Sequence, residues 1–251
     1  MDLIANLSVQ DDSPALVSQW LGFYRRHGVS RFHIFLNEHS ASDRRRADVR
    51  RLLRAPDLTL AAVFEGVEDM QDRVDRFSDY IAAELRARPC VLAADSDEFI
   101  SHPERAAELM KQFDYDFIPG MLVDRFELSG RTIPIRDDLD LARAFPRCTH
   151  FTYAALAGLI TKVPVSRPGA RFRIGLHALE NQEELRGPDW WIPVDHFKWH
   201  GDVIQRIRDR VARGYGGEHY LRQCKALLES FVIGGDRIDL TGIPSWLRSE
   251  W

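Results

Sequence analysis

The chain has 251 residues, of which 45% are hydrophobic and 29% charged, a composition typical of a globular protein large enough to bury one substantial core. Its formal net charge of −4 argues against a general nucleic-acid-binding protein, because such proteins hold phosphates with a cationic surface. Its three cysteines are widely spaced, which argues against a zinc site or a disulfide scaffold and favours a reducing compartment. The start of the chain carries no signal-peptide pattern, and no stretch reaches the roughly 18 apolar residues of a membrane helix. We therefore expect a cytoplasmic protein.

Strand and helix patterns alternate over the first hundred residues. Strands are expected at 3–7, 31–36, 58–64 and 90–94, with helices between them at 14–27, 43–54 and from 70 to about 89. The first helix opens on Ser13 and Pro14, a capping residue followed by a proline at the first helical position, and it stops at Gly28. This alternation predicts an α/β fold with an open, mostly parallel central sheet and helices on both faces.

The pattern becomes irregular beyond residue 115. Strand-like pieces occur at 116–123, 159–165, 171–176 and 192–199, and two amphipathic helices, striped from Val203 to Val211 and from Tyr220 to Phe231, close the chain. The sequence shows no internal repeat and no linker. One domain over residues 1–251 is therefore the expectation.

The most informative segment is the acidic end of the strand at 90–94. Asp95, Asp97 and Glu98 follow this apolar run directly, at the carboxyl end of a strand, where ligands bind in open α/β sheets. Three neighbouring anions repel one another unless a cation or hydrogen-bond donors compensate them. Carboxylate oxygens suit Mg²⁺ or Mn²⁺. The plain alternative is a solvated loop in which Asp97 or Ser101 caps a helix; the buried strand before the acids favours the metal site.

Several segments resemble family 2-like and family 92-like glycosyltransferases. Residues 19–35 (QWLGFYRRHGVSRFHIF) resemble the opening of these families, residues 37–43 (NEHSASD) their DN.SsD loop, and residues 95–99 (DSDEF) their DxDEF box. Residues 123–126, 161–163, 175–177 and 196–199 follow in the family's order, and the resemblance spans residues 3 to about 240. It departs at residues 8–12 (SVQDD), where the family has KNE, and it lacks the WxxFG element.

The resemblance implies a GT-A-like fold, a nucleotide-diphosphate sugar donor with UDP as the expected nucleotide, a divalent Mn²⁺ or Mg²⁺ ion, and inversion at the anomeric carbon. The acceptor would be a hydroxyl of a glycan, a lipid-linked molecule or a small molecule. Residues 1–100 would then form a nucleotide-sugar-binding half and residues 101–251 an acceptor-binding half.

Candidate donor-binding residues lie at strand ends. We predict that Asn6 and Asp12 after the first strand, and Asn37 and Asp43 after the second, contact the nucleotide together with Asp95. The alternative for Asp12 is an ordinary turn before the helix, and for Asp43 a helix cap. Arg171 and Lys198 are candidates for the diphosphate, and an arginine in a structural ion pair would give the same pattern.

Asp95 and Asp97 are the predicted metal ligands, and the resemblance implies His196 as the third, with His177 and His200 as rivals. The alternative for His196 is a structural histidine that is hydrogen-bonded to the sheet edge. For the general base that takes the acceptor proton, the candidates are Asp124, Glu180 and His177, and Asp124 paired with Arg125 as a structural feature is equally compatible with the sequence. Trp190 and Trp191 offer flat faces for a sugar, although such residues more often belong to a core.

One predicted helix is basic, and two functions other than glycosyl transfer are also compatible with the sequence. The arginines of the 43–54 helix, from Arg44 to Arg54, suit peripheral contact with anionic lipids, and an ordinary solvated helix face is favoured over that contact. Another metal-dependent nucleotide enzyme, such as a nucleotidyltransferase, would share the acidic strand end, but it would carry a glycine-rich phosphate loop that residues 8–12 do not provide. A non-catalytic sugar- or nucleotide-binding descendant is the third reading.

Overall fold

The computed structural model describes residues 1–8, 13–38, 44–65, 70–214, 218–241, 243 and 248–249. The chain forms two compact units. The first comprises residues 1–121 and 161–194, and the second comprises residues 122–160 and 195–251.

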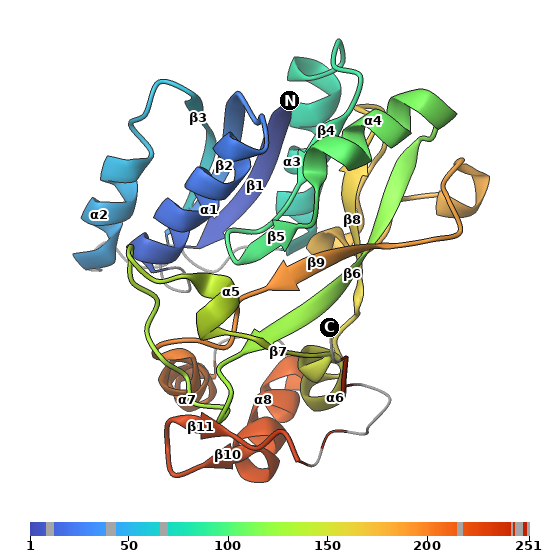
Figure 1. Cartoon of the computed structure of the whole chain (residues 1–251). Coiled ribbons are helices and arrows are strands. Elements are labelled where there is room, and N and C mark those ends of the chain that lie inside the picture. The colour runs from blue at the N-terminus through green and yellow to red at the C-terminus, as the bar shows by residue number, and fades with distance from the viewer. Residues whose placement is uncertain are drawn as a thin grey trace. The chain divides into compact units, whose positions relative to one another are not determined.

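The first unit is built on a sheet whose central strands are parallel. These strands lie in the order β3-β2-β1-β4 (Figure 1), and they are β1 (Asp2–Ser8), β2 (Arg31–Glu38), β3 (Leu58–Glu65) and β4 (Val91–Ala93). Next to β4 the sheet continues with β8 (Thr161–Ser166) and the first half of β6 (Phe117–Phe126), both in antiparallel pairings. The predicted α/β fold with a mostly parallel central sheet is confirmed. Two of the strand-like pieces predicted in the irregular second half of the sequence form these antiparallel strands.

Helices cover both faces of this sheet. From α1 (Pro14–Arg26), Trp20 packs on Phe32 of β2, with ring centroids 5.7 Å apart. From α3 (Met70–Glu84), Phe77 packs on Phe35 of the same strand at 5.3 Å. Phe32 and Phe35 are three residues apart, so they point to opposite faces of β2. The capped start of α1 also appears as predicted, because the Leu16 N–H donates to Ser13 Oγ over 3.1 Å.

The strand order places a topological switch point between β1 and β4. The chain leaves β1 through α1 to β2 on one side, continues through α2 (Arg44–Leu52) to β3, and returns through α3 to β4 on the other side of β1. Ligands of open α/β sheets bind at the carboxyl ends of the strands where the order reverses. The acidic segment after β4 lies at that point.

One predicted strand was wrong, and one helix was not predicted. Residues 171–176 form no strand but a loop that ends in the 3₁₀ turn η1 (Ile174–Leu176), with one isolated bridge between Phe172 and Leu179. Gly175 adopts φ 74° there, which suits glycine and interrupts an extended chain. The helix α4 (Pro103–Phe113) was missed, although its proline at the first turn and its buried Ala106 and Met110 follow ordinary helical rules.

The second unit holds an aromatic core. Phe126, Phe151 and Trp199 pack against one another and against α7 (Val203–Arg213) and α8 (Glu218–Ser230). Both closing helices were predicted from their apolar stripes. The smaller elements are α5 (Leu141–Ala144), α6 (Phe151–Leu156), β7 (Arg147–Thr149), β12 (Arg248–Ser249) and the hairpin of β10 (Val232–Ile233) and β11 (Arg237–Ile238). Within the described ranges of both units, no helix has the length and apolar character that crossing a membrane requires.

Candidate functional site

The acidic segment after β4 forms a tight turn. The backbone N–H of Glu98 donates to the carbonyl of Asp95 over 3.0 Å, and the N–H of Asp95 donates to Glu98 Oε2 over 3.0 Å. This reciprocal pair bends the chain between β4 and the short strand β5 (Glu98–Ile100). Oxygens of Asp97 and Glu98 lie within 4.8 Å of each other. The turn therefore brings carboxylate oxygens of Asp97 and Glu98 together, and the sharing of one ion by Asp95 and Asp97 stays a prediction.

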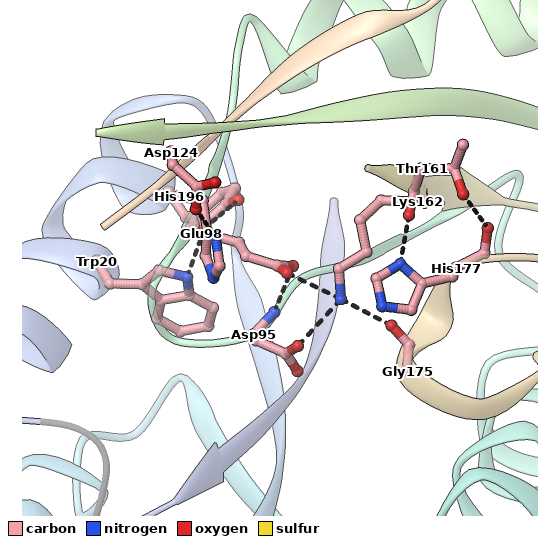
Figure 2. A network of polar contacts seen from close by, with 10 residues as sticks. Trp20, Asp95, Glu98, Asp124, Thr161, Lys162, Gly175, His177 and His196 are labelled. Carbon is pink, nitrogen blue, oxygen red and sulfur yellow. Dashed lines mark hydrogen bonds and ion pairs between the residues drawn. The ribbon is translucent and has the colours of Figure 1, made fainter. Parts of the chain in front are cut away.

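A buried lysine lies against this turn. Lys162 of β8 places Nζ 3.0 Å from Asp95 Oδ2, 2.8 Å from Glu98 Oε1 and 2.8 Å from the carbonyl of Gly175 (Figure 2). The side chains of Lys162 and Glu98 are each 4% exposed, whereas that of Asp95 is 33% exposed. Burial alone would lower the pKa of Lys162, but the carboxylates of Asp95 and Glu98 raise it above its usual value. The lysine is therefore charged at neutral pH.

Two aromatic side chains of α1 form hydrogen bonds with the backbone of the same turn. The carbonyl of Glu98 accepts hydrogen bonds from Trp20 Nε1 at 3.0 Å and from the Tyr24 hydroxyl at 3.1 Å. The Tyr24 hydroxyl in turn accepts from the N–H of Ile100 at 2.9 Å. Three buried hydrogen bonds thus fix the backbone on which the carboxylates stand.

The charges of the turn fit a divalent cation. Asp95, Asp97 and Glu98 supply three negative charges and Lys162 one positive charge, so the sum over these four described residues is −2. Glu98 is committed to Lys162 and to the turn, while Asp95 is partly open to solvent and keeps a second oxygen beside the one bound to Lys162. Hard oxygen donors with this residual charge are the chemistry that Mg²⁺ or Mn²⁺ selects.

Two asparagines stand at the carboxyl ends of β1 and β2. Asn37 is 5% exposed, and the side-chain oxygens of Asn6 and Asn37 are buried without a hydrogen-bond partner among the described residues. Unsatisfied buried acceptors are uncommon in folded proteins and call for an explanation such as a bound ligand. The two acids predicted with them, Asp12 and Asp43, lie outside the described residues.

Arg171 and Glu180 lie on the surface of the first unit and contact each other. Arg171 donates to Asp79 over 2.7 Å, and its guanidinium lies 3.7 Å from Asp75 and 3.6 Å from Glu180. The hydrogen bond to Asp79 is the main cause of its raised pKa. This is the ion-pair arrangement that the sequence left open as the alternative for Arg171.

His177, in contrast, belongs to the loop that meets the acidic turn. Its Nδ1 lies against the carbonyl of Thr161, and the carbonyl of Gly175, two residues earlier, accepts from Lys162 (Figure 2). Trp190 and Trp191 of the same unit are 37% and 47% exposed, so neither belongs to the core. The arginine helix is partly structural, since Arg50 forms a bidentate pair with the buried Glu38 at 2.6 and 2.9 Å.

In the second unit, Asp124 and His196 contact each other. Asp124 is 1% exposed, and its Oδ1 lies 2.8 Å from His196 Nδ1 and 3.0 Å from Trp199 Nε1. Thr152 adds its hydroxyl to Oδ1 at 2.7 Å and its backbone N–H to Oδ2 at 2.6 Å. Burial would raise the pKa of Asp124, but the hydrogen bonds from His196 and Thr152 hold it below its usual value. Arg125 pairs with Asp195, not with Asp124.

The remaining candidates of the second unit are Lys198 and His200. Lys198 places Nζ 5.8 Å from the ring centre of Trp199, and His200 is 4% exposed. The structure determines each unit by itself, so the joint ligation of a metal by Asp95, Asp97 and His196 stays a prediction.

Sequence reasoning missed three residues of these networks. Lys162, Thr152 and Trp199 each make at least one buried contact to a candidate carboxylate. The segment 161–163 was singled out only for its family resemblance. A lysine inside an otherwise apolar strand was the available signal, because a buried lysine requires a carboxylate partner.

No protein-family model and no curated protein sequence matches the chain. Among solved structures, the Staphylococcus aureus protein TarS (residues 1–349, in complex with UDP-GlcNAc) is similar over 91% of this chain and 71% of its own, with 13% identity and a TM-score of 0.42. A 4-diphosphocytidyl-2C-methyl-D-erythritol synthase is similar over 67% and 74%, with 15% identity and a TM-score of 0.33. HddC from Yersinia pseudotuberculosis is similar over 50% and 59%, with 9% identity and a TM-score of 0.31.

Proposed function

We propose that this protein is a metal-dependent glycosyltransferase of the GT-A type, which moves a sugar from a nucleotide-diphosphate donor to an acceptor hydroxyl with inversion. The observation that carries the proposal is the acidic turn at Asp95–Glu98, located at the switch point between β1 and β4. Sheets of this kind bind their ligands at that position. Three carboxylates within four residues, two of them contacted by one buried lysine, favour a cation there.

Asp95 and Asp97 would hold Mn²⁺ or Mg²⁺, with His196 as the third protein ligand. The metal would offset the charge that develops on the leaving diphosphate. Glu98 pairs with Lys162 and accepts a hydrogen bond from the Asp95 N–H. Its role is to hold Asp95 in place.

The donor nucleotide would lie along the carboxyl ends of β1 and β2. There the buried oxygens of Asn6 and Asn37 would accept hydrogen bonds from the N–H and hydroxyl groups of a base and a ribose. Lys198 is proposed as a cation for the diphosphate. UDP is the proposed nucleotide, and the acceptor is a glycan, a lipid-linked molecule or a small molecule.

For the general base we favour His177 over Asp124 and Glu180. Asp124 is buried and accepts four hydrogen bonds, so it offers no accessible site for a proton. Glu180 is accessible, but its nearest described cation is the surface residue Arg171. His177 lies in the loop that contacts the acidic turn through Lys162, and an imidazole titrates near neutral pH.

The test is a panel of nucleotide sugars assayed for nucleoside-diphosphate release with Mn²⁺ or Mg²⁺. We expect turnover that EDTA abolishes and that Asp97→Asn lowers by at least about a hundredfold. The matched control is Asp114→Asn, at the end of α4, where the left-handed backbone (φ 56°) tolerates asparagine. Full turnover in excess EDTA would refute the metal dependence. Pyrophosphate exchange with a nucleoside triphosphate would identify a nucleotidyltransferase, and donor binding without turnover would identify a non-catalytic descendant.

A further inference from the structure

The Asp124–His196 pair carries a prediction about which imidazole nitrogen bears the proton. We propose that Asp124 is a positioning residue that holds neutral His196 in the tautomer protonated at Nδ1, so that Nε2 carries the lone pair by which a histidine binds a metal ion. The part of this inference that concerns the metal rests on the proposed function. The part that concerns the tautomer rests on the second unit alone.

The tautomer follows from the hydrogen-bond chemistry of the pair. An ionised carboxylate only accepts hydrogen bonds, so the nitrogen 2.8 Å from Asp124 Oδ1 must be a donor. That nitrogen is Nδ1 of His196, as the dashed contact in Figure 2 shows. The Thr152 N–H and Trp199 Nε1–H can only donate, and with the Thr152 hydroxyl they engage both oxygens of Asp124, as an acceptor-only carboxylate requires. A neutral imidazole with the proton on Nδ1 has its lone pair on Nε2.

The carboxylate itself is held from three other directions. The Thr152 N–H, one of the unpaired donors in the first turn of α6, approaches Oδ2 at 2.6 Å, while the Thr152 hydroxyl and Trp199 Nε1 approach Oδ1 at 2.7 and 3.0 Å. The ring of Trp199 is in turn stacked on Phe126 and in edge contact with Phe151. Asp124 therefore has one orientation, and it imposes that orientation on His196.

The carboxylate has more donors than a helix cap supplies. Thr152 provides its N–H and hydroxyl at the start of α6, and His196 and Trp199 add two further donors to Oδ1. Metal-binding histidines commonly donate their second nitrogen to a carboxylate, which fixes the ring and increases the basicity of the ligating nitrogen. Buried Asp124 and His196, 1% and 6% exposed, reproduce that relation within the described part of the second unit.

The first experiment measures the tautomer directly in the metal-free protein. Long-range ¹H–¹⁵N correlation of histidine-labelled protein at about pH 8, where an unperturbed imidazole is neutral, distinguishes Nδ1–H from Nε2–H. The His196 signal is assigned by its loss in His196→Gln. We expect Nδ1–H in the wild type. A wild-type His196 protonated at Nε2 would overturn the proposal, whatever any variant does.

The second experiment changes the acceptor into a donor. In Asp124→Asn the amide N–H₂ can face His196, which then accepts at Nδ1 and carries its proton on Nε2. We expect the tautomer to switch and the Mn²⁺ affinity, measured by calorimetry, to fall by roughly 10- to 100-fold. The control is Thr152→Val, which removes one hydrogen bond to Asp124 but keeps the acceptor for His196. It should retain both the tautomer and the Mn²⁺ affinity, even if its thermal midpoint falls as far as that of Asp124→Asn.

The outcomes separate this proposal from the proposed function. A switched tautomer with wild-type Mn²⁺ affinity would remove His196 from the metal site and overturn the inference. Equal loss of Mn²⁺ affinity in Thr152→Val and Asp124→Asn would reduce Asp124 to a structural role. A switched tautomer with weakened Mn²⁺ binding, in a protein that turns over no nucleotide sugar, would support this inference while the proposed function fails.

Discussion

Lys162 allows the sharpest test of how the acidic turn is stabilised. Lys162→Met keeps most of the side-chain volume but removes the ammonium that pairs with Glu98 at 2.8 Å, where both side chains are 4% exposed. Breaking a buried ion pair by deleting one partner costs about 3–5 kcal/mol, because the remaining charge is buried without compensation. The contact to Asp95 adds little to this figure, since solvent screens a carboxylate that is a third exposed.

A double-mutant cycle assigns that loss to the pair. Glu98→Gln keeps an acceptor for the Asp95 N–H but carries no charge, so the combined Lys162→Met/Glu98→Gln variant buries no ion at this place. Replacing both members of a buried pair by neutral groups is often close to neutral for stability. We therefore expect the double variant to recover most of the free energy of unfolding that Lys162→Met loses, which gives a coupling energy above about 1.5 kcal/mol.

The assay is urea unfolding of the four proteins in metal-free buffer. Lys162→Arg is a useful fifth protein, because it keeps the charge but has to fit a larger planar group into the space between two carboxylates. A loss below about 1 kcal/mol for Lys162→Met, or a double variant no more stable than that single variant, would refute the view that Lys162 is the internal counter-ion of the turn.

Three further outcomes are expected. Tyr24→Phe leaves the buried N–H of Ile100 without its acceptor and should lower the free energy of unfolding by about 1–3 kcal/mol. The control, Tyr153→Phe at an exposed site, should change that free energy by less than about 0.5 kcal/mol in the same urea titration. Burial would raise the pKa of Asp124, but hydrogen bonds to its ionised form lower it below 3.8. The ionised carboxylate therefore contributes its full stabilisation of the folded state above pH 3.8. The difference in the free energy of unfolding between wild type and Asp124→Asn should narrow only as the pH falls below 3.8. Arg171→Ala should change stability by less than about 1 kcal/mol, because its pairs are exposed, and calorimetry should find donor affinity unchanged; a clear loss would return Arg171 to the diphosphate.

The parallel half of the fold was predictable because its signals are local. Ser13 and Pro14 start a helix through a cap that involves neighbouring residues only, and the run before Asp95 is apolar because both faces of β4 are buried. The antiparallel strands were not predictable in the same way. β8 pairs with β4, about 70 residues away in sequence, and nothing local to either strand specifies that partner. Residues 171–176 look like a strand by composition, and the positive φ angles of Gly175 and Leu176 break it.

The acidic turn was predictable as a site, but its internal partners were not. The sequence showed three acids in a row of four residues, and from these alone Glu98 is as good a ligand as Asp97. What distinguishes them is Lys162, which reaches the turn only because β8 lies beside β4. Likewise, Asp124 was predicted as a base because it follows an apolar run. The four hydrogen-bond donors that surround it come from residues between 28 and 75 positions further along the chain. Contacts of that range depend on the tertiary fold, and the local pattern does not specify which residues make them.

The position of Lys162 also bears on how the acidic turn stays folded when no metal ion is bound. With three carboxylates and no cation, the turn would carry repulsion that favours protonation or unfolding. Lys162, held by Asp95, Glu98 and the carbonyl of Gly175, compensates one of these charges within the turn. It also couples Asp95 to the loop that carries His177, so a metal that draws Asp95 toward itself acts on the same lysine that fixes this loop.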